Sequence, residues 1–276
     1  MQHVATILKN TINFESVIHI SYNQLRTFLQ CPQKYQYQYV RGLEREFIPE
    51  YLPFGSAIHF AAEIFYKYVA DKKDKPPIDM LIEAFEDKWK ALINEKVRFK
   101  DDPAVMEKKG HDLISVFYEQ VSPVRIIGVE IPFSLEIIDH ESGYILPCQL
   151  VGVFDLIEAD DYGNPIVVEL KTGNKRFSEG QIDIDLQATL YGYALSRMGY
   201  TDNAGNTLIR FDQLLKTKKP AMERYFTVRN KTHYRQAIRT IKQVLHAIEQ
   251  EAFFPISGWH CDDCSFQKTC KDAVLN

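Results

Sequence analysis

The sequence contains no long hydrophobic run. None of its apolar stretches approaches the roughly 20 residues that a helix needs to cross a bilayer, so the composition excludes a helical membrane protein. The first seventeen residues, MQHVATILKNTINFESV, carry polar side chains throughout and do not look like a signal peptide. We therefore expect an intracellular, cytoplasmic protein that does not contact a membrane.

Cysteine is scarce and odd in number. There are five cysteines, and without a secretion signal an odd count argues against a disulfide framework. Cys148 lies in an apolar segment and is expected to be an ordinary core thiol. The others are Cys31 and three that fall within the last 16 residues: Cys261, Cys264 and Cys270. This crowding indicates metal or cluster binding.

An overall excess of positive charge is also missing. The 276 residues include 33 Lys and Arg against 37 Asp and Glu, a net charge of −4, so the chain is not a polycation. One segment differs: residues 210–242 hold ten Lys or Arg and two acids, a local charge of 10 − 2 = +8. Such a segment could hold backbone phosphates. A solvated surface would have the same composition.

The stretch from Val151 to Thr172 contains two runs rich in Val and Ile, joined by the turn residues of 161–165. This pattern predicts a β-hairpin. Alternate side chains of a strand point to opposite faces, so Glu169 and Lys171 share an apolar face, as does Asp155 on the first strand. Burying unpaired charges is costly. Two carboxylates that hold a divalent cation, with the lysine beside it, would explain all three.

Helices and strands are expected to alternate along the rest of the chain. The helices are predicted at 22–30, 33–42, 54–69, 78–98, 104–120, 184–198 and 231–250, and the strands at 125–138, 144–155, up to 171, 206–215 and 222–228. The aromatics of 35–39 could stack bases but are expected to pack between helices. The segment 72–120 is interpreted as a helical insertion or cover without chemistry. Glu130, between apolar neighbours, is a minor candidate for the site, and a surface acid of an edge strand is the preferred interpretation.

A set of spaced motifs now resembles a known group. Asp155, thirteen intervening residues and the triplet Glu169-Leu170-Lys171 resemble the signature of the PD-(D/E)xK nuclease superfamily. Gly55-Ser-Ala-Ile-His59 resembles the G-x-x-x-H motif of its RecB-like branch, and Gln187-Ala-Thr-Leu-Tyr191 resembles that branch's Q-x-x-x-Y motif, in the same order. Phe154 stands where the superfamily often has proline, which removes no ligand.

The resemblance implies an α/β fold with a restriction-endonuclease-like mixed central sheet flanked by helices. It implies one nuclease domain over 1–276, with a core at about 121–250. His59, Asp155, Glu169 and the Leu170 carbonyl would bind Mg²⁺ or Mn²⁺. Lys171 would position the attacking water, while Gln187 and Tyr191 would contact DNA or order the site. Independently of the resemblance, Lys175, Arg176 and the basic segment 216–242 are expected to hold backbone phosphates.

Four of the cysteines form a second candidate site. Cys261-x2-Cys264-x5-Cys270, with Cys31 brought in by the fold, could bind Zn²⁺ or a [4Fe–4S] cluster through four thiolates. The spacing resembles the iron–sulfur staple of RecB-like nucleases, including AddB-type and CRISPR-associated adaptation nucleases. That resemblance favours the cluster, which would clip Cys31 to residues 259–270 in a structural role.

These observations predict a metal-dependent DNA nuclease. Similar nucleases are usually exonucleases of DNA repair, recombination or CRISPR adaptation, and stacking aromatics would favour single-stranded or frayed DNA ends. The chain has no helicase motif, so unwinding would require a helicase or CRISPR-adaptation partner. Two alternatives remain open: a catalytically inactive, iron–sulfur-stabilised DNA-binding subunit of a helicase–nuclease complex, and a redox iron–sulfur protein. The second leaves Asp155, Glu169 and Lys171 unexplained.

Overall fold

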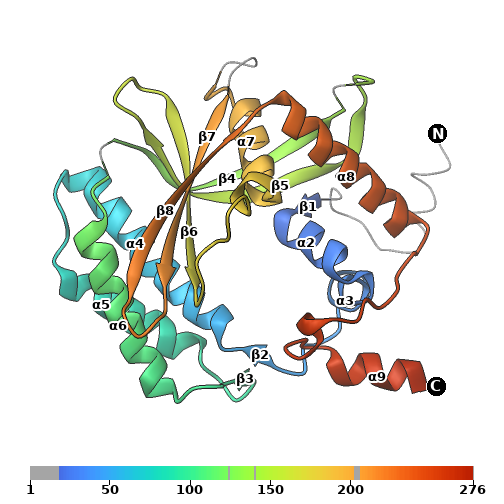
Figure 1. Ribbon diagram of the computed structural model, residues 1–276, viewed down its shortest axis with the longest axis horizontal. Coiled ribbons are helices and arrows are strands. Elements are labelled where there is room, and N and C mark those ends of the chain that lie inside the picture. Colours follow the sequence, from blue (N-terminus) through green and yellow to red (C-terminus); the bar gives the residue numbers. More distant parts are fainter. Residues whose placement is uncertain (1–18, 124, 140, 202–205, 276) are drawn as a thin grey trace. The chain divides into compact units, whose positions relative to one another are not determined.

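The chain alternates helices with the strands of a mixed sheet, as Figure 1 shows. The computed structural model describes residues 19–123, 125–139, 141–201 and 206–275. The strands are β1 (His19–Ser21), β2 (Ile48–Pro49), β3 (Val97–Arg98), β4 (Ile126–Ile138), β5 (Ile145–Ala159), β6 (Pro165–Gly173), β7 (Thr207–Leu215) and β8 (Ala221–Arg229). The α-helices are α2 (Tyr22–Gln30), α3 (Pro32–Tyr35), α4 (Tyr51–Lys72), α5 (Ile78–Leu92), α6 (Pro103–Gln120), α7 (Leu186–Arg197), α8 (Lys231–Glu249) and α9 (Gln267–Leu275). Short π- or 3₁₀-helical turns are η1 (Gln36–Val40), η2 (Ile182–Ile184) and η3 (Trp259–Cys261).

The sheet combines parallel and antiparallel pairs. β5 and β6 form the predicted antiparallel hairpin, β6 and β7 are parallel, and β7 and β8 are antiparallel. β4 also pairs with β5, and β1 pairs with the first part of β5 in parallel. The predicted fold class, a mixed central sheet flanked by helices, is confirmed. No described helix is both long enough and apolar enough to span a membrane.

The chain divides into two compact units. Unit 1 consists of residues 1–47, 133–152 and 231–276, and unit 2 of residues 48–132 and 153–230. Strands β4 and β5 each contribute residues to both units. The expectation of one nuclease domain over the whole chain therefore stays a prediction.

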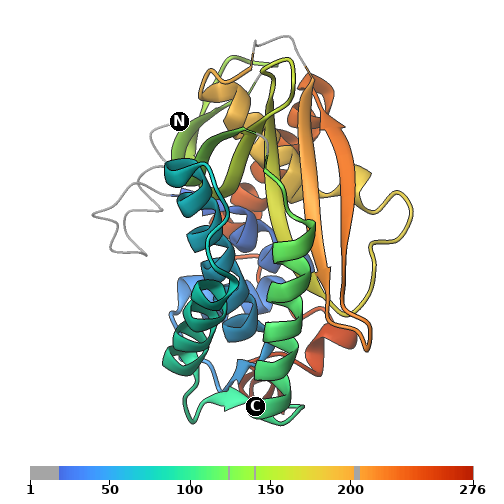
Figure 2. The same cartoon turned by 90° about the vertical axis from the view of Figure 1, so that its left-hand side faces the viewer.

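The core of unit 2 lies between β6 and the helices α4, α5 and α6, which pack along one another in Figure 2. Val168 and Leu170 of β6 point into this core, where they join Phe65, Trp89 and Phe117. Because side chains alternate along a strand, Glu169 and Lys171 are directed to the opposite face, which α7 contacts. The helices predicted at 78–98 and 104–120 correspond to α5 and α6 and complete the core. The prediction of helix over 93–98 is wrong, because α5 ends at Leu92 and Val97–Arg98 pair with β2 as the strand β3.

Gly110 of α6 is required by the packing of α6 on α5. A Cβ atom at this position would lie 2.0 Å from the ring of Phe85. We expect Gly110→Ala to lower the free energy of unfolding by about 1–3 kcal/mol, the usual cost of overpacking a core, as measured by urea denaturation. The exposed Lys108→Ala on the same helix should change it by less than about 0.5 kcal/mol. Equal stabilities of the two variants would contradict this packing.

The first described helix of unit 1, α2, starts at Tyr22 as predicted. Ser21 caps α2, and Gln24 completes a capping box with the Ser21 backbone. The aromatics that follow pack inside the unit: the Tyr35 ring stacks on Phe253, and Tyr37 is 3% exposed. The expectation that the aromatics of 35–39 pack inside the protein is therefore confirmed for Tyr35 and Tyr37. The alternative, stacking on DNA bases, is wrong for these two rings because they are buried in the core.

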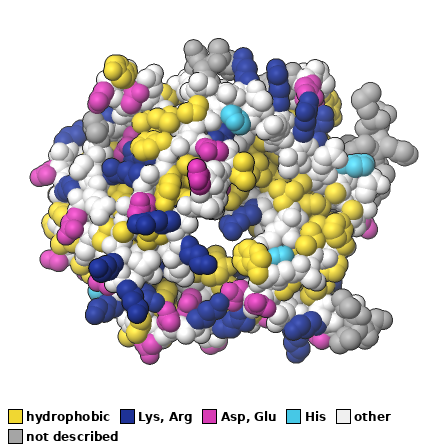
Figure 3. All heavy atoms as spheres, in the orientation of Figure 1, with side chains coloured by type: hydrophobic (Ala, Val, Ile, Leu, Met, Phe, Trp, Pro, Cys, Tyr) yellow, Lys and Arg dark blue, Asp and Glu magenta, His cyan; other side chains and the backbone are white. Residues whose placement is uncertain are grey.

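The basic segment 210–242 is less basic at the surface than along the sequence. Arg210 is buried and forms ion pairs with Glu158 at 2.7 Å and Asp212 at 2.9 Å. Arg229 is 1% exposed, and Lys242 is ion-paired. Figure 3 shows charges of both signs interspersed on the displayed face. Within the segment 216–242 that is expected to hold phosphates, Arg229 is buried and Lys242 is already paired, so the expectation is wrong for these two. For the other cations of that segment it stays a prediction.

Candidate active site

The open end of the β5–β6 hairpin carries the predicted acidic residues. The paired ladder runs from Ala159 opposite Pro165 to Leu156 opposite Val168. One residue beyond it, Asp155 Oδ2 accepts a hydrogen bond of 2.9 Å from the Leu170 backbone N–H. This bond between a side chain and the neighbouring strand holds Asp155 beside the residues that follow Val168.

Glu169 lies at the centre of a hydrogen-bonded group. Its Oε1 accepts bonds of 2.8 Å from Lys171 Nζ and 2.8 Å from Gln187 Nε2. Lys171 Nζ also donates to Gln187 Oε1 at 2.7 Å, so the three side chains form a closed triangle. Glu169 is 4% exposed, and its Oε2 is buried without a hydrogen-bond partner among the described residues. A buried carboxylate oxygen left in this state requires a further partner.

His59 comes to the same group from α4. Its Nδ1 lies 3.5 Å from Asp155 Oδ2, and the ring is partly exposed. Burial opposes the imidazolium, but the neighbouring Asp155 and then Glu169 hold the pKa of His59 above its ordinary value. Gly55, one turn earlier on α4, faces β6: a Cβ there would lie 3.7 Å from Thr172 Oγ1. The G-x-x-x-H motif thus places α4 against the active strand.

Tyr191 supports the triangle from α7. Its ring packs edge-on against Phe154 with centroids 5.3 Å apart, and its hydroxyl is hydrogen-bonded to Gln187. Burial, and then the charge of Glu169, raise the pKa of the tyrosine well above its ordinary value. Phe154, which replaces the common proline, therefore has a packing role. Of the two predicted roles for Gln187 and Tyr191, the geometry favours ordering the site.

A pocket of about 440 Å³ opens beside Asp155 and His59 and brings in further acids. Glu63, one turn after His59, and Glu130 of β4 both line it. Glu130 is about half-buried, and burial followed by the charges of Asp155 and Glu63 raises its pKa to about 7. Of the two interpretations of Glu130, its place in the lining of the pocket supports the site candidate. Its φ of 51° lies in the left-handed region, a conformation rarely adopted by non-glycine residues and often found at functional sites.

The charges of this group fit a divalent cation. Four carboxylates, those of Glu63, Glu130, Asp155 and Glu169, converge with one histidine and Lys171. Burial first, and then Asp155, raise the pKa of Glu169 to about 7. Like-charged carboxylates in a buried site repel each other, and a bound cation would relieve the repulsion. Oxygen donors with one imidazole suit Mg²⁺ or Mn²⁺.

Glu169→Gln is expected to stabilise the metal-free protein at high pH. The folded pKa of about 7 exceeds the ordinary 4.5, so the folded state binds the Glu169 proton more tightly than the unfolded chain. Protonated Glu169 therefore contributes to the free energy of unfolding. This contribution is fully present below about pH 4.5 and is lost as the pH rises through about 7, a decrease on the order of 3 kcal/mol. Glutamine has no such proton, so the variant escapes this loss.

The measurement is urea unfolding in EDTA at about pH 5 and about pH 8. The stability of Glu169→Gln relative to the wild type should rise between the two pH values by on the order of 2–3 kcal/mol. A difference that is the same at both pH values would show that the ionisation of Glu169 does not strain the fold.

Two further candidates lie outside this acidic group: the predicted phosphate contacts of one loop, and a second set of residues that could bind a metal ion. Arg176 is paired with Glu223 at 2.6 Å, which leaves the exposed Lys175 as the better candidate for a phosphate contact from that loop. Glu86, Glu107 and His111 of α5 and α6 also bring ligand atoms within 4.8 Å of one another. Glu86 already pairs with Lys90 at 2.8 Å and with His111 at 3.0 Å, so this group is partly neutralised within the protein.

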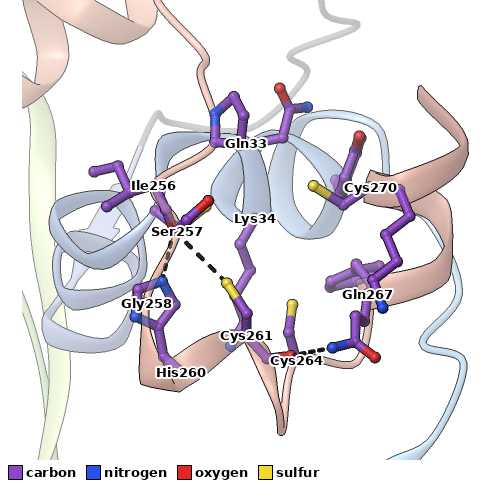
Figure 4. A pocket seen from close by; sticks show the side chains of 15 residues that line it. Gln33, Lys34, Ile256, Ser257, Gly258, His260, Cys261, Cys264, Gln267 and Cys270 are labelled. Atoms are coloured by element: carbon purple, nitrogen blue, oxygen red, sulfur yellow. Dashed lines mark hydrogen bonds between the residues drawn. The ribbon is translucent and has the colours of Figure 1, made fainter. Parts of the chain in front are cut away.

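The four candidate cluster cysteines meet in unit 1. Cys31, Cys261, Cys264 and Cys270 line one pocket of about 500 Å³, together with apolar residues such as Ile256 and Phe266. Figure 4 shows the side chains of Cys261, Cys264 and Cys270 around this pocket. All four are free thiols, and Cys148 is buried elsewhere in the unit. Burial raises the pKa of Cys148 to about 12, as expected of a core thiol.

Comparison with known proteins decides the family. The family model of the PD-(D/E)XK nuclease superfamily matches residues 19–271. The chain belongs to the PD-(D/E)XK nuclease superfamily. Nucleases of this superfamily generally use a divalent metal ion, which agrees with the chemistry of the acidic group. No curated protein matches the sequence.

Solved structures also resemble the superfamily member described here. A candidate exonuclease from Eubacterium rectale aligns with a TM-score of 0.48 and 10% identity, over 95% of this chain and 91% of that one. The protein SSO0001 aligns with a TM-score of 0.38 and 14% identity, over 99% and 97% of the two chains.

Proposed function

We propose that this protein is a Mg²⁺- or Mn²⁺-dependent deoxyribonuclease that hydrolyses phosphodiester bonds. The observation that carries the proposal is the convergence of Asp155, Glu169, Lys171 and His59, with Glu169 Oε2 buried and unpartnered. Because the chain belongs to a nuclease superfamily, phosphodiester hydrolysis is the reaction that we assign to this group of residues.

Three side chains and one backbone group are proposed to hold the ion. Asp155, Glu169 and His59 supply oxygen and nitrogen donors, and the Leu170 carbonyl would join them. A divalent ion bound there would act as a Lewis acid, lowering the pKa of water and neutralising phosphate charge. For His59 to serve as a ligand, its ring must be neutral. Because Asp155 favours the protonated imidazolium, binding of the ion should release a proton from His59.

Lys171 is proposed as the catalytic cation. Its ammonium is fixed by two hydrogen bonds, to Glu169 Oε1 and Gln187 Oε1, and its side chain remains 32% exposed. An ammonium held in this way can orient the attacking water and stabilise the negative charge that develops on the phosphate. Gln187 is a positioning residue, since it contacts both Lys171 and Glu169, and Tyr191 holds Gln187.

We place the protein in the RecB-like branch, acting as an exonuclease in DNA repair, recombination or CRISPR adaptation. Support comes from the order of the motifs and from the cysteine pocket. We propose that this pocket holds a [4Fe–4S] cluster. All four cysteines line one pocket of about 500 Å³, and the spacing Cys261-x2-Cys264-x5-Cys270 resembles the iron–sulfur staple of RecB-like nucleases.

The test of the enzymatic proposal is cleavage of DNA labelled at either end, single- or double-stranded, with Mg²⁺, Mn²⁺ or EDTA. We expect cleavage with either metal and none in EDTA. Mononucleotides or short products released progressively from one end would identify an exonuclease. DNA that is bound but remains intact with both metals, in protein with a full cluster, would instead support the non-catalytic DNA-binding subunit.

A further inference from the structure

The helical segment 72–120, for which no chemical role was predicted from the sequence, contributes to one wall of the active-site pocket. Lys88 of α5 lines the pocket that also contains His59 and Asp155. Among the described residues lining this pocket, Lys88 is the single lysine or arginine. The insertion therefore contributes a cation to an otherwise acidic cavity.

The ammonium of Lys88 differs from its neighbours in having no acidic partner. Nearby lysines are paired with carboxylates: Lys67 with Glu63 at 2.5 Å, Lys90 with Glu86 at 2.8 Å and Lys109 with Asp101 at 2.5 Å. Within the described part of the chain, Lys88 has no ion pair. Its Nζ instead lies 5.2 Å from the centre of the Phe60 ring. A cation–π contact orders a lysine while leaving its hydrogen-bond donors available.

Apolar side chains at the same pocket remain exposed. Tyr51 and Leu52, in the first turn of α4, are 49% and 40% exposed. A tyrosine ring in this position offers a face on which a base can stack. An unpaired ammonium and an exposed aromatic ring beside a metal-binding group are complementary to a nucleotide, which combines an anionic phosphate with a flat apolar base.

We propose that this pocket is a nucleotide subsite, in which Lys88 binds a backbone phosphate next to the scissile one and Tyr51 stacks on the adjoining base. The pocket volume of about 440 Å³ lies within the range of about 300–1,000 Å³ typical of small-ligand pockets. The inference rests on the proposed nuclease function. It assigns the insertion a role in holding the substrate strand, distinct from the chemistry at Lys171.

The test measures DNA binding and cleavage separately. Binding of a fluorescent single-stranded oligothymidylate is followed by anisotropy in Ca²⁺ over a series of salt concentrations. Lys88→Ala is expected to weaken binding about tenfold, as for loss of one charge-assisted contact, and to reduce the slope of log affinity against log salt by about 0.7. Lys88→Arg should retain most of the affinity. Lys90→Ala, on the same helix with its ammonium already paired, is the matched control and should bind like the wild type.

Tyr51 provides an independent arm. Tyr51→Ala should weaken binding about tenfold without changing the salt slope, and Tyr51→Phe should restore it, because stacking requires the ring and not the hydroxyl. In cleavage assays with Mn²⁺, Lys88→Ala should raise KM with kcat nearly unchanged. A wild-type protein that binds DNA but does not cleave it would refute the nuclease proposal while leaving these binding differences intact. Equal affinity and salt slope for Lys88→Ala, Lys90→Ala and wild type would overturn the subsite.

Discussion

Lys171→Ala is expected to lower kcat for DNA cleavage by about 10²–10⁴-fold, the range for removing a residue that transfers protons or stabilises transition-state charge. The ammonium donates hydrogen bonds to Glu169 Oε1 and Gln187 Oε1, both within the proposed site. Because the interaction is strongest in the transition state, KM should change much less than kcat. Single-turnover cleavage of end-labelled DNA measures this directly.

Two controls separate catalysis from folding and from charge. Lys72→Ala removes an exposed lysine of α4 that pairs with Asp71, and it should cleave DNA at the wild-type rate. Lys171→Ala leaves Glu169 buried beside Asp155 with one partner fewer, so its circular dichroism and its affinity for DNA must be shown to persist. A folded Lys171→Ala protein with wild-type kcat would remove Lys171 from the mechanism.

Cys264→Ser is expected to abolish the visible absorption of anaerobically purified protein and to lower its Tm by about 10 °C or more. Metal binding couples to folding, and the loss of several kcal/mol shifts the Tm of a chain of this size by such an amount. Cys264 lines the same pocket as Cys31, and the backbone N–H of Phe266 donates to its sulfur. Without the cluster, the clip between residues near Cys31 and the C-terminal segment is lost.

The matched control for the cluster is Cys148→Ala. Cys148 is buried in the same unit but does not line the cysteine pocket. This variant should keep the absorption and the iron content of the wild type, with at most a modest loss of stability. If the wild-type protein lacked this absorption and contained one zinc per chain, the pocket would be assigned to Zn²⁺ in place of the cluster. Unchanged absorption and iron in Cys264→Ser would exclude Cys264 as a ligand.

The local pattern of the sequence was sufficient to locate the acidic hairpin. Alternation along β6 places Glu169 and Lys171 on one face and Leu170 on the other, and the structure has this arrangement. The capping box at Ser21 and the i, i+4 pair of Gln187 and Tyr191 are equally local, so they could be predicted from spacing. Features whose geometry is determined within a single helical turn or strand can therefore be predicted from the sequence.

Features that depend on contacts between distant segments were not predictable in this way. Glu130 of β4 lines the pocket and has a left-handed φ, and its position between apolar residues in GVEIPF was the one signal of it in the sequence. Lys88 is an ordinary helix lysine until the packing of α5 brings it to Phe60. Arg210 adds to the charge of the basic segment, but tertiary packing buries it beside Glu158 and Asp212.

The most direct test of this account is the rate of DNA cleavage by purified protein as Mn²⁺ is added to the wild type, Asp155→Asn and Glu169→Gln. We predict that the wild-type rate rises with Mn²⁺ and saturates. Both variants should fold and bind DNA but cleave it about 10³-fold more slowly at saturating Mn²⁺, a loss comparable to removal of a principal electrostatic group. Equal Mn²⁺-dependent cleavage by all three proteins would contradict the assignment of the hairpin as the active site.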